Sequence, residues 1–129
     1  MNQVAAIVSR GNVDNSRPVW QTNDAAPFTL PLLTVAEGTT GRIMITVIGR
    51  AADGTSKAWQ ITRTGKYQGG VLTLVGSTPA PIVEGDAGAT AWTAQLSVGG
   101  ADVSVVLTGD AAKQVAWSVV VDSFLVTAT

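Results

Sequence analysis

The chain has 129 residues, 13% of them charged and 46% hydrophobic, and it contains no histidine and no cysteine. This length fits one domain with a hydrophobic core that needs no disulfide. The lack of both residue types excludes Ser-His-Asp and Cys-His catalytic sets, zinc sites built from these ligands, and haem or iron–sulfur ligation by them. We therefore expect a non-enzymatic structural or binding protein without a cofactor.

The charge balance and the distribution of apolar residues exclude further classes of partner. A net charge of −1 provides no basic surface for a phosphate backbone, so we expect no nucleic-acid partner. No run approaches the roughly 18 apolar residues of a membrane-spanning helix, and no basic region precedes the apolar residues near the N-terminus as in a secretory signal. A chain this apolar and this poor in charge favours association with copies of itself.

Residues 1–36 contain three of the prolines, Pro18, Pro27 and Pro31. Because proline removes a backbone donor and favours extended geometry before it, this part should be extended and only partly paired in a sheet. It is either an N-terminal arm with one or two edge strands, or the first strands of the domain that follows.

Residues 41–63 predict a β-hairpin closed by the Asp53-Gly54 turn. In both halves of the hairpin, residues alternate between an apolar face and the opposite face with a period of two. The inner face is assigned Ile43, Ile45, Val47, Trp59 and Ile61. The outer face is assigned the basic residues Arg42, Arg50, Lys57, Arg63 and Lys66, as a solvated face or one that docks onto an acidic partner.

The second half repeats this pattern, with strands predicted over 71–76, 90–98, 102–108 and 115–127 and only a turn over 110–114. Short strands with such turns are typical of an all-β sandwich, jelly roll or small barrel. We predict an antiparallel β-sandwich or jelly-roll-like domain over 37–129 with the extended arm over 1–36. The predicted inward residues are Trp92, Ala94, Leu96, Val98, Val103, Val105, Leu107, Trp117, Val119 and Val121.

Some residues could instead carry a site. Three tryptophans (Trp59, Trp92 and Trp117) could form a platform for sugar stacking, but their register with aliphatic residues favours the core, whereas Trp20 favours a contact surface. The loop Glu84-Gly85-Asp86 has too few carboxylates for Ca²⁺ and is interpreted as a solvated turn. Asp53 and Asp102 are interpreted as residues that form turns or begin strands.

Four stretches resemble a β-rich module of virion structural proteins of tailed bacteriophages. They are residues 49–61, with the Lys57-Ala58-Trp59 sequence, 74–77, 86–92 and 115–119, so the resemblance extends over about 41–121. It implies a virion component without enzymatic activity that is usually a homotrimer. The shared positions are core and turn residues, so the resemblance supplies no functional residues.

A module of this length, without a fibre shaft, favours a capsid decoration (cement) protein on the surface of the head over a tail protein. The expected partners are copies of this chain and the major capsid protein or other virion proteins. The alternatives are a small tail-fibre or spike subunit, a carbohydrate- or receptor-binding module and, more remotely, a glycoside-active enzyme. The candidate interface residues are Trp20, Pro27, Phe28, Pro31, Arg42 and Arg50.

Overall fold

The computed structural model describes residues 7–8 and 20–127, and at 7, 8 and 20 it describes the backbone alone. Strands dominate this part of the chain, and its one helical element is a single 3-10 turn. No helix in the described residues could cross a membrane. The elements are β1 (Ile7–Val8), β2 (Trp20–Thr22), β3 (Phe28–Thr34), β4 (Thr39–Ala51), β5 (Ser56–Gln68), β6 (Val71–Leu74), β7 (Ile82–Gly85), η1 (Ala87–Ala89), β8 (Thr93–Gly99), β9 (Asp102–Thr108) and β10 (Val115–Thr127).

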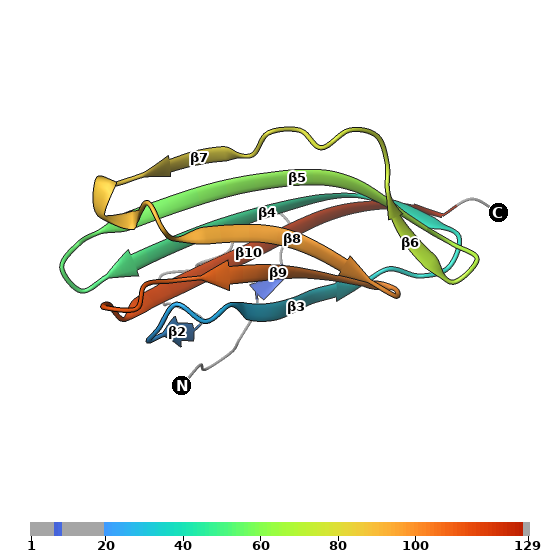
Figure 1. Cartoon of the computed structure of the whole chain (residues 1–129). Coiled ribbons are helices and arrows are strands. Elements are labelled where there is room, and N and C mark those ends of the chain that lie inside the picture. Colours follow the sequence, from blue (N-terminus) through green and yellow to red (C-terminus); the bar gives the residue numbers. More distant parts are fainter. Residues whose placement is uncertain (1–6, 9–19, 128–129) are drawn as a thin grey trace.

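The strands form two sheets that lie one over the other, and Figure 1 shows β9 and β8 in front of the larger sheet. At the centre of the larger sheet β4 lies between β10 and β5; β1 and β2 share the other edge of β10, and β6 and β7 share the other edge of β5. The smaller sheet has the order β3-β9-β8. All pairings are antiparallel except the parallel pairing of β1 with β10. The predicted all-β sandwich is confirmed.

Alternation along β4 sets the inner face of the larger sheet. Ile43, Ile45 and Val47 are fully buried, and the residues between them face outward. The register places Ile45 opposite Ile61 of β5 and Val121 of β10, so apolar side chains meet across three strands. Such rows stabilise a sheet because side chains on adjacent strands lie about 5 Å apart.

The smaller sheet closes the core from the other side. Val103, Val105 and Leu107 of β9 are fully buried, and β3 adds Leu30 and Leu32. Residues inside the predicted 1–36 segment thus contribute to the core, whereas its predicted boundary at residue 36 stays a prediction.

Two glycines are required by the geometry of the larger sheet. At Gly49 a Cβ atom would lie 2.9 Å from the Trp117 ring. The Trp117 indole therefore fits against β4 because residue 49 has no side chain. At the β5–β6 turn, Gly70 has a φ of 78°, a conformation that glycine adopts most easily. The Glu37 carboxylate accepts hydrogen bonds from the backbone N–H groups of Gly69 and Gly70, at 2.9 and 3.0 Å, and fixes that turn.

The prediction that all five basic residues of the hairpin face outward is wrong for Arg63 and Lys57. Both share the parity of Trp59 along β5 and therefore point to the inner side. Arg63 is buried, and the Lys57 ammonium donates to the carbonyl oxygens of Ala89 and Trp92, at 3.2 and 2.9 Å. The outward assignment holds for the exposed side chains Arg42, Arg50 and Lys66.

Candidate functional site

The three tryptophans of the hairpin and the second half form an aromatic cluster in the core. The Trp117 ring lies 5.8 Å from that of Trp59 and 6.1 Å from that of Trp92, centroid to centroid, in tilted arrangements. The buried Trp117 Nε1 donates to Thr22 Oγ1 at 2.9 Å, which satisfies its polar atom. The core interpretation is confirmed. Trp20 pairs with Trp117 along the backbone, but its side chain lies outside what the structure describes.

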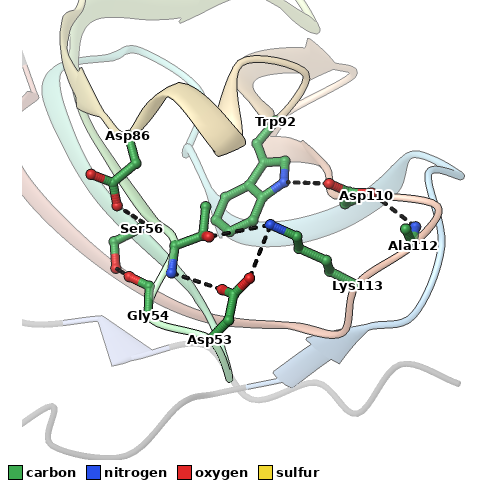
Figure 2. A network of polar contacts seen from close by, with 9 residues as sticks. Asp53, Gly54, Ser56, Asp86, Trp92, Asp110, Ala112 and Lys113 are labelled. Carbon is green, nitrogen blue, oxygen red and sulfur yellow. Dashed lines mark hydrogen bonds and ion pairs between the residues drawn. The ribbon is translucent and has the colours of Figure 1, made fainter.

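Polar side chains gather at one end of the sandwich, in the loop cluster formed by residues 53–56, 86–92 and 110–113 (Figure 2). The Asp86 carboxylate accepts from the Ser56 N–H at 2.9 Å, and Asp110 accepts from the Ala112 N–H at 2.8 Å. Asp110 also accepts from the Trp92 Nε1 at 3.5 Å. These carboxylates fix loops onto one another, and within the described residues no group of three or more Asp and Glu side chains could hold a metal ion.

Asp53 forms both a hydrogen bond and an ion pair in this cluster. Its carboxylate accepts from the Thr55 N–H at 2.9 Å and pairs with the Lys113 ammonium at 3.1 Å. These contacts, the Thr55 backbone bond first, lower the pKa of Asp53 from 3.8 to about 2. The interpretation of Asp53 as a turn residue is confirmed, and Asp102 likewise begins β9 and accepts from the Thr34 hydroxyl at 2.8 Å.

The Glu84-Gly85-Asp86 sequence is exposed as predicted, but the prediction of a turn is wrong for Glu84 and Gly85, which end strand β7 and pair with β5. The three residues line a shallow hollow of about 360 Å³. Glu84 and Asp86 both contribute to it, together with Lys57 and Ser56. Both side chains are exposed, and one oxygen of the Asp86 carboxylate also accepts from the Ser56 N–H. A glycosidase needs two carboxylates at one site, and Glu84 and Asp86 are the pair that this hollow contains.

The candidate interface residues do not form one surface. Pro31 is exposed on the outer face of β3, in the smaller sheet, and Pro27 and the half-buried Phe28 lie where that strand begins. Arg42 and Arg50 lie on the outer face of the larger sheet, eight positions apart on β4, a separation of about 26 Å. Their role in an interface stays a prediction.

The last residues of β10 carry exposed apolar side chains that sequence reasoning missed, with Phe124 and Val126 on one face of the strand and Leu125 on the other. Phe124, Leu125 and Val126 are 58%, 47% and 69% exposed. Three consecutive large apolar residues break the alternation that governs the strand up to Val121, and this break was the available signal. We call these three residues the β10 patch.

No protein-family model and no curated protein matches the chain. Among solved structures, the chain is similar to the tailspike protein of Acinetobacter phage vB_ApiP_P1, with 18% sequence identity and a TM-score of 0.36. The match covers 98% of this chain and 20% of the tailspike chain, so this chain spans about a fifth of that protein's length. A TM-score this low does not establish a shared fold.

Proposed function

We propose that the protein is a non-enzymatic structural component of a bacteriophage virion that assembles as a homotrimer, decorates the capsid and bridges its subunits. The observation that carries the proposal of assembly is the β10 patch, on a sheet edge that no other strand of the described residues occupies. The virion setting rests on the resemblance of the stretches between residues 41 and 121 to phage virion modules.

Among the described residues, the end of β10 that carries the β10 patch has a strand paired to one edge only. One edge of β10 pairs with β4 along its whole length, whereas the other pairs with β2 at residues 115–117 and with β1 at 120–121. From Asp122 onward, no strand among the described residues occupies that edge. Proteins usually protect such edges with proline or lysine, as Pro31 does on the outer strand β3, but residues 123–127 contain neither.

A closed ring of three copies requires two different patches on each copy, because its contacts are heterologous. At the same end of the larger sheet, β6 lies on the opposite side of β4 and β5 from β10. Val71, in β6, and Val75, directly after it, are 59% and 45% exposed. The Leu72 N–H of β6 already donates to the Gly100 carbonyl. The second patch, Val71 and Val75, would therefore contact a neighbouring copy through its side chains and not through backbone pairing. In the proposed trimer, the β10 patch of one copy packs on Val71 and Val75 of the next.

The native mass of variants tests this arrangement. The unsubstituted protein should be a trimer, and Val126→Lys or Val71→Lys should each give a monomer, because each destroys one half of the same contact. When mixed, the two variants retain one intact pair of patches, so they should form a heterodimer and no larger species. Val83→Lys is the matched control, since Val83 is an exposed valine of β7 away from both patches, and it should remain trimeric.

Several results would contradict the proposed assembly. If the unsubstituted protein is a monomer at micromolar concentration, the proposed trimer is wrong. A dimer that Val71→Lys leaves intact would indicate a two-fold contact between β10 patches instead of a ring.

The capsid role is tested separately, by imaging whole particles and by mixing the trimer with expanded capsids. A decoration protein should bind these at a fixed stoichiometry, and its binding should make the shell more resistant to heat because it binds the assembled state. Binding only to tails would favour the small fibre or spike subunit. Hydrolysis of a glycan that is lost in Glu84→Gln would contradict the non-enzymatic proposal.

A further inference from the structure

Arg63 is a buried cation without an anionic partner. Its side chain is only 8% exposed, and arginine remains protonated in proteins. Within the part of the chain that the structure describes, the ion pair found joins Lys113 to Asp53, and Arg63 has no carboxylate within ion-pair distance. Buried charges are normally paired because an unpaired one is costly.

Among the described residues, the hydrogen bonds of Arg63 leave most of its donors unused. One guanidinium nitrogen donates to Thr78 Oγ1 at 2.9 Å, and the other terminal nitrogen approaches the Gly76 carbonyl oxygen at 3.4 Å. A guanidinium has five N–H donors in a planar fork that matches a carboxylate. Both partners are neutral oxygens, so they hold the fork in place and do not compensate its charge.

The same guanidinium lines a cavity of about 350 Å³ between the two sheets. The cavity lies where β5 faces β8, beneath the connection from β6 to β7 that Figure 1 shows beside β5. Its volume falls within the range of small-molecule sites. Apolar residues supply most of the wall, no carboxylate contributes to it, and its polar residues are Arg63, Thr78 and Gln95.

We propose that Arg63 and this cavity bind a small organic carboxylate with an apolar body. The carboxylate would accept from the free N–H groups of Arg63, and the apolar body would pack on Ile61 and Leu96 from the two sheets. The absence of aromatic side chains from the wall favours an apolar body over a sugar ring, which proteins commonly stack on aromatic rings. On β8, Ala94 and Leu96 face the core, and Gln95 between them lies at the exposed margin of the cavity.

Titration with benzoate, followed by NMR, tests the site. Benzoate should bind with a Kd of about 1 mM, as expected for so small a ligand, and the signals that shift should be those of residues 61–63, 78–81 and 94–96. Benzyl alcohol has the same ring without the charge and should bind at least about 10-fold more weakly. Glucuronate carries the carboxylate on a sugar and should also bind more weakly than benzoate.

Substitution of the guanidinium should weaken benzoate binding selectively. Arg63→Gln should raise the Kd about 10- to 100-fold, and Arg63→Lys should raise it less because the charge remains. Arg42→Gln is the matched control, since it removes an exposed arginine from the neighbouring strand, and it should leave the Kd unchanged.

Thermal unfolding separates a binding role from a purely structural one. If Arg63 serves a ligand, Arg63→Met should keep or raise the Tm while benzoate binding is lost, because an apolar residue often replaces a buried charge without loss of stability. Failure of benzoate to saturate, equal binding of benzyl alcohol, tighter binding of glucuronate or unchanged affinity in Arg63→Gln would each overturn the proposal. None of these results bears on the proposed trimer.

Discussion

The hydrogen bond between Thr22 and Trp117 attaches β2 to the core, and replacing Thr22 by valine measures how strongly. Thr22 is buried, its neighbour across the strands is Val115, and its Oγ1 accepts from the Trp117 indole N–H at 2.9 Å. Thr22→Val keeps the shape of the side chain but removes the acceptor. The Trp117 N–H would then be buried without a partner, which costs about 1–3 kcal/mol.

This cost converts into a measurable change of the Tm. At about 2.1 cal/mol/K per residue, the 129 residues give an entropy of unfolding near 270 cal/mol/K, so 1 kcal/mol corresponds to about 4 °C. We expect the Tm of Thr22→Val to fall by about 4–10 °C in a calorimetric scan at fixed protein concentration. Thr46→Val, at an exposed position of β4, is the control and should change stability by less than about 0.5 kcal/mol. Equal Tm values for the two variants would refute the anchoring of residues 20–22 to the core.

Three further predictions test the core, the close approach at Gly49 and the loop cluster. Leu107→Ala, at a fully buried position of β9, should lower the free energy of unfolding by about 2–5 kcal/mol in urea titration, and a loss below 1 kcal/mol would mean that the sheets do not pack there. Gly49→Ala should cost about 1–3 kcal/mol because its Cβ would lie 2.9 Å from the Trp117 ring, whereas Gly99→Ala, with nothing within 4 Å, should be close to neutral; equal effects would argue against the placement of that ring. Asp53 has a pKa of about 2 in the folded state against 3.8 ordinarily, so it stabilises the fold above pH 4 and this contribution is lost as the pH falls through about 2. The Tm of the unsubstituted protein should therefore fall more steeply between pH 4 and pH 2 than that of Asp53→Asn, and parallel curves would contradict the assigned contacts.

The strands and their inner faces were predictable because alternation is a local property of the sequence. Val103, Val105 and Leu107 repeat with a period of two, and the Gly99-Gly100 pair before them marks the turn, so no knowledge of the partner strands was required. The pairing partners were not predictable in this way. That β10 lies beside β4 depends on contacts between residues far apart in the chain, which no local pattern encodes.

The outward assignment of Arg63 and Lys57 was wrong because their charge was given more weight than their alternate positions along β5. Trp59, Ile61 and Arg63 occupy successive alternate positions of β5, so the alternation of the strand already placed Arg63 on the inner face. A basic residue is rarely buried without a partner, which made the outer face the better prediction for an average protein. The exception arises because the connection from β6 to β7 folds over Arg63 and supplies Thr78 and Gly76 as acceptors. That connection is a property of the tertiary structure.

The β10 patch and the Arg63 cavity lie on different strands of the larger sheet, with β4 between β10 and β5, so the two proposals can fail independently. Neighbouring strands lie about 4.8 Å apart, which places β5 about 10 Å from β10 and the open edge of β10 on the side that faces away from the cavity. A partner on that edge would leave the cavity open, whereas the second contact of the proposed ring, at Val71 and Val75, lies next to Leu74 of the cavity wall. Val126→Lys should therefore become monomeric and still bind benzoate with unchanged affinity, whereas Arg63→Gln should remain a trimer and lose benzoate. If the monomeric variant also lost benzoate, the cavity would depend on the assembled state, and the separation of the two surfaces argued from the sheet order would be wrong.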